Sequence, residues 1–234
     1  MAGLRRGRLR WWLLGGLVVL AVVVVGGTWL YIHVIEGPAP APLGLKSAGS
    51  SSPASASAAD SVAGKWRVGS GSVVGYRVNE VLAGQNNVAV GRTSDVAGSL
   101  SISGSTVRTA SLSVPMDTIK SDQSGRDAQF NGRIMETSTY PTGTLTLTTP
   151  IALGALPAAG VIRTYHASAG LTLHGHTRKV TFALAAERTA AGIEVSGSIP
   201  IVFADWDIGN PSFAGFVTTQ NHGLLEFLIK FSRS

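Results

Sequence analysis

From Trp66 to the end of the chain, apolar side chains recur at every second position. The repeat is present in seven segments, and short Gly- and Ser-containing turns such as residues 103–106 and 190–193 separate several of them. This period places one face of a strand toward a core and the other toward water, as is typical of antiparallel sheet. The members of the apolar faces are Val74, Tyr76 and Val78; Val96, Leu100 and Ile102; Leu145 and Leu147; Val161, Tyr165, Ala167, Leu171 and Leu173; Val180, Phe182 and Leu184; Ile193, Val195, Ile199, Ile201 and Phe203; and Leu225, Phe227, Ile229 and Phe231.

About eight such strands with one polar interruption predict an all-β fold, namely a closed antiparallel β-barrel, with a β-sandwich as the alternative. Small residues among the bulky inward ones favour the barrel, because they leave space along its axis. These small residues are Gly98, Ala110, Ala167, Ala169 and Gly197. A barrel of eight strands has an interior that side chains just fill or that holds one slender ligand.

Residues 11–35 contain no Asp, Glu, Lys or Arg, and four arginines precede them in residues 1–10. About 20 apolar residues span a bilayer as a helix, so we expect residues 11–35 to be a transmembrane helix with residues 1–10 in the cytoplasm. A cleaved signal peptide is the alternative, but its apolar region is usually shorter. Residues 36–64 are rich in Pro, Ala, Ser and Gly, which predicts a flexible linker. The predicted barrel domain then comprises residues 65–234, on the extracytoplasmic side of the cell membrane.

The charge distribution limits the possible partners. The net charge is +6, but residues 65–234 hold 14 Lys and Arg against 11 Asp and Glu without a basic run, which argues against nucleic acid. The chain has no cysteine, so disulfides, thiolate chemistry and cysteine zinc sites are excluded.

Residues 124–142, SGRDAQFNGRIMETSTYPT, form the densest polar stretch of the domain. Ser124 is a candidate helix cap, and Phe130, Ile134 and Met135 recur on one side, which predicts a short amphipathic helix that ends before Tyr140-Pro141. The structural interpretation is a local Arg126–Asp127 ion pair on a helix that closes the barrel. The functional interpretation makes the helix a lid whose Arg126 or Arg133 meets a ligand headgroup.

Other polar motifs give weak support for catalysis. The His174-Gly175-His176 turn has two histidines but no evident third metal ligand, and hydrogen bonding within the turn is the simpler role. Asp205 and Asp207 place two carboxylates on one face if a strand continues there, but they adjoin a loop sequence. We therefore predict no enzyme activity, no metal and no cofactor.

Five motifs follow one another along the domain: KWRVGSGSVVGYRV, AVGRTSDVAGSLSISG, VPMDTIKSDQSGRDAQFNGRIMETSTYPTGTLTLTTPI, LTLHGHTRKVTF and DWDIGNPSF. In these motifs and in their order, the domain resembles the YceI-like family of bacterial envelope proteins. The resemblance covers residues 65–234. The resemblance implies a lipocalin-like barrel whose apolar pore holds a polyisoprenoid or similar lipid. This chain departs from the family at Leu145, where an aromatic residue is usual.

The resemblance and the inward faces together predict a lipid held in the barrel lumen for carriage or storage. The predicted ligand-binding residues are Tyr76, Val78, Leu112, Val114, Met116, Phe130, Ile134, Leu147, Tyr165, Phe182, Leu184, Phe203 and Phe227. The expected partners are a long-chain lipid and, through the N-terminal helix, the membrane. Two alternatives are a structural or interaction domain whose barrel is filled by its own side chains, and a hydrolase of envelope lipids.

Overall fold

A computed structural model describes residues 15–20, 22–23, 26–27, 39–45, 62–82, 84–213, 215 and 217–234. Residues 15–20, 22–23 and 26–27 are helical. Within the described ranges, no helix has both the length and the apolar character that a membrane crossing requires. The cytoplasmic segment, most of the predicted 11–35 helix and linker residues 36–38 and 46–61 lie outside the described residues.

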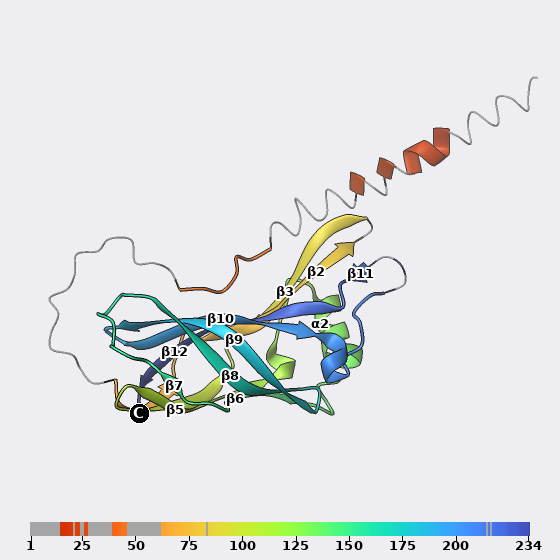
Figure 1. Ribbon diagram of the computed structural model, residues 1–234. Helices are drawn as coiled ribbons and strands as arrows, with labels where there is room; N and C mark the ends of the chain where they lie inside the picture. Colours follow the sequence, from red (N-terminus) through yellow and green to blue (C-terminus); the bar gives the residue numbers. More distant parts are fainter. Residues whose placement is uncertain are drawn as a thin grey trace, which may run out of the picture.

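The domain is a closed, wholly antiparallel β-barrel, as the alternation predicted (Figure 1). Eight strands follow one another around the ring in the order β1-β4-β5-β6-β8-β9-β10-β12, and pairing of β12 with β1 closes it. The bounds of these strands are β1 Gly64–Val68, β4 Ala97–Ser103, β5 Thr106–Pro115, β6 Thr142–Leu147, β8 Arg163–Leu173, β9 His176–Thr189, β10 Gly192–Val202 and β12 His222–Arg233. Strand β7 (Ile151–Ala152) pairs with β5 at the edge of the ring.

Two further strands extend the wall toward one end of the barrel. Strand β2 (Val73–Leu82) continues β1 along β12 after a break at residues 69–72, where the Ser72 hydroxyl accepts a hydrogen bond from the Lys230 amide. Strand β3 (Gln85–Thr93) pairs with β2, and β11 (Val217–Thr219) pairs with the tip of β2. We call this end, with β2, β3 and β11, the mouth of the barrel.

The wall is incomplete at the mouth between β3 and β5. A single bridge joins the two sides there, in which the amides of Arg92 and Lys120 each donate to the other's carbonyl at 2.8 and 2.9 Å. Helix α2 (Ser124–Gln129), continued by the π-helical turn η3 (Phe130–Ile134), lies beside this gap. The short 3₁₀ turns η2 (Met116–Thr118) and η4 (Phe203–Trp206) follow β5 and β10 at the same end.

Local details of the predicted helix and of the 205–207 motif differ from expectation. Gln123, not Ser124, precedes the first helical turn, and no side chain caps it. Residues 203–206 leave the strand as a 3₁₀ turn, and Asp207 has a left-handed backbone with φ of 55°. Asp205 and Asp207 therefore do not share a strand face, in agreement with their place beside a loop sequence. Trp206 turns inward instead, and its indole donates to the Leu171 carbonyl at 3.2 Å.

The core follows the period-two faces. Ala169, Leu171, Ile199 and Ile229 are among its most buried members, each no more than 2% exposed. The domain begins slightly before residue 65, because Val62 is buried and its carbonyl accepts from the Trp66 indole at 2.9 Å.

Part of the predicted linker lies against the barrel. The carbonyls of Pro40 and Ala41 accept hydrogen bonds from Arg77 and Arg92, and the Leu45 amide donates to the Ser196 hydroxyl at 3.2 Å. We call residues 39–45 the strap.

Candidate functional site

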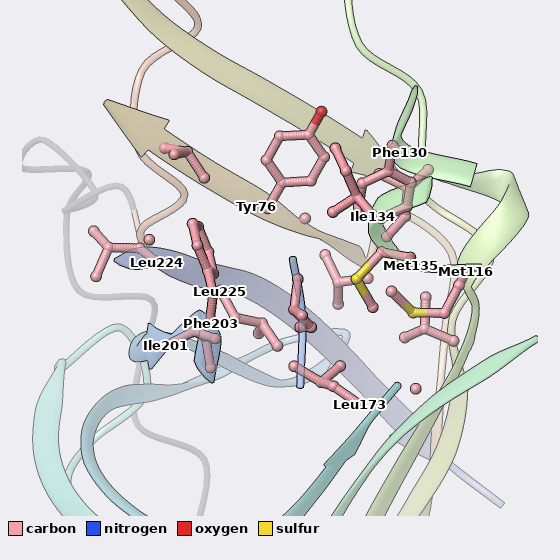
Figure 2. A pocket seen from close by; sticks show the side chains of 18 of the residues that line it. Tyr76, Met116, Phe130, Ile134, Met135, Leu173, Ile201, Phe203, Leu224 and Leu225 are labelled. Carbon is pink, nitrogen blue, oxygen red and sulfur yellow. The ribbon is translucent and has the colours of Figure 1, made fainter. Parts of the chain in front are cut away.

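An apolar cavity of about 170 Å³ opens at the mouth of the barrel (Figure 2). Residues from β2, β5, β10 and β12 line its sides, and residues of α2, η3 and η2 lie over it. In Figure 2 Tyr76, Met116, Met135 and Phe203 surround the same space from different elements. The predicted ligand-binding residues that line this cavity are Tyr76, Val78, Leu112, Val114, Met116, Phe130, Ile134, Phe203 and Phe227.

A second apolar cavity of about 120 Å³ occupies the other half of the barrel. Its lining is apolar except for Ser111 and the hydroxyl of Tyr165. The predicted residues that line it are Leu147, Tyr165, Phe182 and Leu184, and Leu112 and Phe227 line both cavities. The structure thus places all the predicted lumen residues on one or other cavity wall, and their contact with a ligand stays a prediction.

The two cavities lie end to end along the barrel. Leu112, Leu145 and Phe227 line both, so these three side chains form the waist between them. Phe227 is held from the side by Phe182, with ring centroids 5.9 Å apart in an edge-on arrangement. The position at which the chain departs from the resembled family, Leu145, is therefore a waist residue.

Small inward residues leave space along the barrel axis, in part as the sequence predicted. Of the five predicted small residues, Ala110, Ala167 and Ala169 line the second cavity, whereas Gly98 and Gly197 line neither. Gly143, which was not predicted, lines the first cavity. At Gly91 the reason for glycine is steric, because a Cβ there would lie 2.3 Å from the Tyr76 ring. Gly91 thus lets that ring lie flat across β3. Gly197 similarly leaves room for Phe227, whose Cζ would be 2.7 Å from an added Cβ.

Helix α2 and turn η3 close the first cavity through stacked rings. Phe130 of η3 stacks on Tyr76 with centroids 5.1 Å apart and an interplanar angle of 16°. Burial of Tyr76 raises the pKa of its hydroxyl to about 12, while the nearby Arg126 guanidinium acts in the opposite direction. The phenol is therefore neutral over the physiological pH range.

A charged cluster lies at the rim beside this lid. Glu80 and Arg126 line the first cavity, and Arg126 pairs with Glu80 at 3.3 Å and with Asp122. Asn87 also donates to Glu80 at 2.9 Å. The expected Arg126–Asp127 ion pair was wrong, because the Asp127 carboxylate accepts from the amide and hydroxyl of Ser121 instead. Two carboxylates share one guanidinium, so the cluster is not a positively charged anion site.

Arg133 does not line either cavity. Its guanidinium donates to the carbonyls of Asn210, Pro211 and Ser212, at 3.4, 2.8 and 3.4 Å, and lies over the Phe213 ring. The side chain holds the loop after η4 against the helical lid. Of the two arginines predicted to meet a headgroup, only Arg126 reaches the cavity.

Sequence reasoning missed several lining residues that lie outside strands. Ile119, Met135, Ile208 and Pro211 all line the first cavity. They belong to turns and to the lid, where no period of two or 3.6 marks the inward side. Met135 was noted as apolar in the helical pattern, and that was the only signal available.

The other polar candidates form no reaction centre. His174 is buried, its Nδ1 lies 3.3 Å from the Trp206 carbonyl, and its ring packs on Tyr140. It thus contacts η4 and not its own turn. Its Nε2 lies 3.7 Å from the Glu136 carboxylate, beyond hydrogen-bonding distance. Over the described part of the chain, no three His, Asp or Glu residues come together as a metal site.

Comparison with protein families agrees with this geometry, since the family described as YceI-like domain matches residues 66–231. The chain belongs to the YceI-like family. Comparison with curated proteins finds no match. A polyisoprenoid-binding domain from Saccharophagus degradans implicated in plant cell wall breakdown has a similar fold, with a TM-score of 0.59 and 17% identity over 74% of this chain and 99% of that one. BcnA from Burkholderia cenocepacia aligns with a TM-score of 0.51 and 18% identity, over 66% of this YceI-like chain and 94% of that structure.

Proposed function

We propose that this YceI-like protein binds a polyisoprenoid or similar long-chain amphiphile in the two cavities, and that it carries or stores the lipid at the cell envelope. The observation that supports this most directly is the pair of apolar cavities that meet at the Leu112–Leu145–Phe227 waist. The solved relative from Saccharophagus degradans is described as polyisoprenoid-binding, which supports the same ligand class. The role is binding without catalysis.

Transfer of an apolar chain from water into the cavities supplies the affinity. Each buried methylene contributes about 0.8 kcal/mol, so a five-carbon isoprene unit contributes roughly 4 kcal/mol before ordering costs. Phe182, Leu184 and Phe227 supply apolar contact without a hydrogen-bonding group that would require a polar partner. Length and exclusion of water, and not a charged anchor, set the affinity of such a site.

The polar end of the amphiphile lies at the rim in this proposal. The Arg126 guanidinium and the Glu80 carboxylate line the mouth cavity, and Arg126 is the predicted headgroup contact. The proposal also places the barrel on the extracytoplasmic side of the membrane, with residues 11–35 as its anchor. Their composition supports this, because they lack charged residues and follow four arginines.

Organic extraction of the purified chain followed by lipid mass spectrometry tests the proposal. We expect a stoichiometric long-chain lipid from the wild-type protein. Ala167, 3% exposed, lines the second cavity, so Ala167→Leu should reduce the amount of bound lipid. Ala183 is exposed on the neighbouring strand β9, so Ala183→Leu serves as the matched control.

A wild-type protein that holds no lipid after expression and takes up none from added prenyl alcohols would overturn the proposal. The barrel would then be a structural or interaction domain. Equal lipid content in the Ala167→Leu and Ala183→Leu variants would show that the lipid binds outside the second cavity.

A further inference from the structure

The strap gives the barrel a defined direction relative to the N-terminal part of the chain. Glu226 points to the outside of the barrel wall, since its neighbours Leu225 and Phe227 line the lumen, yet it is only 3% exposed. Arg77 and Arg92 cover it, with nitrogen–oxygen distances of 2.7 and 3.5 Å. Both guanidinium groups also donate to carbonyls of the strap, so the strap, whose Pro40 and Ala41 are exposed, lies over the buried Glu226 and its two arginines.

The order of these contacts shows which way the strap runs. Pro40 is bound by Arg77, which lies opposite Leu224 near the start of β12. Leu45 is bound by Ser196, which lies opposite Leu228, four residues farther along β12. Because β12 starts at the mouth and ends beside β1, the N-terminal end of the strap is the end nearer the mouth. Figure 1 shows the mouth elements β2, β3, β11 and α2 at one end and the C-terminus at the other.

We infer that the barrel mouth faces the surface of the lipid bilayer that the anchor enters, and that the strap fixes this orientation. The inference rests on the proposed anchor. Residue 35, the last of the proposed anchor, and Ala39 are four residues apart, and a fully extended chain spans at most about 14 Å over that distance. A barrel bound by the strap therefore stays next to the bilayer, with its cavity opening on the near side.

The mouth surface fits a lipid partner through its exposed apolar side chains. Phe213, in the loop held by Arg133, is 56% exposed, and Val81 near the tip of β2 is 36% exposed. The charges at this end have both signs, with Asp122 and Asp205 as well as Arg178, so attraction to anionic headgroups does not choose the orientation. The strap sets the orientation of the barrel, and Phe213 then contacts the headgroup layer.

Site-specific fluorescence on the full chain tests the orientation. The chain has no cysteine, so Phe213→Cys at the mouth and Ser105→Cys in the exposed turn at the opposite end each give one labelling site. The labelled chains are reconstituted into phosphatidylcholine vesicles that contain headgroup-quencher lipid. We expect at least threefold stronger quenching at position 213 than at position 105. The strap binds through main-chain atoms, which a Gly/Ser replacement would keep, so the test separates it from the anchor instead. Insertion of a flexible Gly/Ser segment of roughly 20 residues after residue 38 should remove the difference. The same insertion after residue 52, beyond the strap, should leave it.

Equal quenching at the two positions, stronger quenching at 105, or a difference that survives the insertion after residue 38 would overturn the inference. Failure of the chain to enter vesicles would overturn it too, because the anchor would be absent. Lipid extraction from the same samples separates this result from the proposed function. Bound lipid without orientation contradicts only the inference, and orientation without bound lipid contradicts only the carriage proposal.

Discussion

Substitution of Leu145 by Trp at the waist should weaken the binding of long lipids and leave the binding of short ones almost unchanged. Leu145 is one of three residues that line both cavities, and its neighbours across the sheet are Leu112 and Leu171. A Trp there fills the passage, so a long prenyl chain is confined to the mouth cavity. Each isoprene unit that no longer enters the second cavity forfeits roughly 4 kcal/mol, which is on the order of a thousandfold in Kd.

Titration with prenyl alcohols of different length measures this effect. A short alcohol such as geraniol should bind the wild type and Leu145→Trp within about threefold of each other, because the first cavity alone holds it. A long alcohol such as solanesol should bind the variant at least a hundredfold more weakly. Thr146→Trp, on the exposed outer face of the same strand, is the control. Overpacking costs about 1–3 kcal/mol of stability, so thermal unfolding must first show a folded variant. Unchanged binding of the long alcohol by a folded variant would refute a ligand that passes the waist.

Three other predictions concern stability. The pKa of Tyr76 is about 12 in the folded state against 10.0 for an unperturbed tyrosine. Its neutral hydroxyl therefore contributes roughly 2–3 kcal/mol to the unfolding free energy below pH 10, and this contribution is lost as pH rises from 10 to 12. In a pH series of urea unfolding curves, Tyr76→Phe should remove most of the fall in unfolding free energy over this range. Trp206→Phe removes the indole donor to the Leu171 carbonyl and should lower the unfolding free energy by about 1–3 kcal/mol, measured by denaturant titration. Glu226→Gln removes the charge that two arginines share, so we expect the unfolding free energy to fall by about 2 kcal/mol. We also expect faster proteolysis within the strap, and an unchanged cleavage rate would contradict the role of these ion pairs in holding it.

The sequence predicted the barrel wall and its inward face well for a physical reason. A strand's side chains alternate strictly between its two faces, so one correctly assigned inward residue identifies all the remaining inward residues of that strand. This is why Val78, Leu147 and Phe182, from three different strands, all line a cavity. The alternation could not show where a strand stops. In residues 203–207 it did not show that the chain turns at η4 or that Trp206 is buried.

The polar contacts were harder to predict because they depend on residues far apart in the sequence. Arg126 pairs with Glu80, 46 positions away, and not with the adjacent Asp127. The strap gave no signal at all, since it binds the barrel through its own backbone carbonyls and one amide, and a Pro-Ala composition indicates only an extended chain. Its order comes from Arg77 and Arg92, whose position over Glu226 is set by the register of β2, β3 and β12.

The single Arg92–Lys120 bridge has a mechanical consequence for the barrel. Elsewhere around the ring, neighbouring strands are joined by continuous ladders, and parting them would break many hydrogen bonds at once. Between β3 and the segment after β5, the two amide–carbonyl bonds of that bridge are the only backbone hydrogen bonds among the described residues. Side chains also hold this gap, through the Thr93–Thr118 hydrogen bond at 2.8 Å and the Arg126–Glu80 ion pair at 3.3 Å. A sideways opening here would break two backbone hydrogen bonds together with these side-chain contacts, and it would lead to the Tyr76–Phe130 stack.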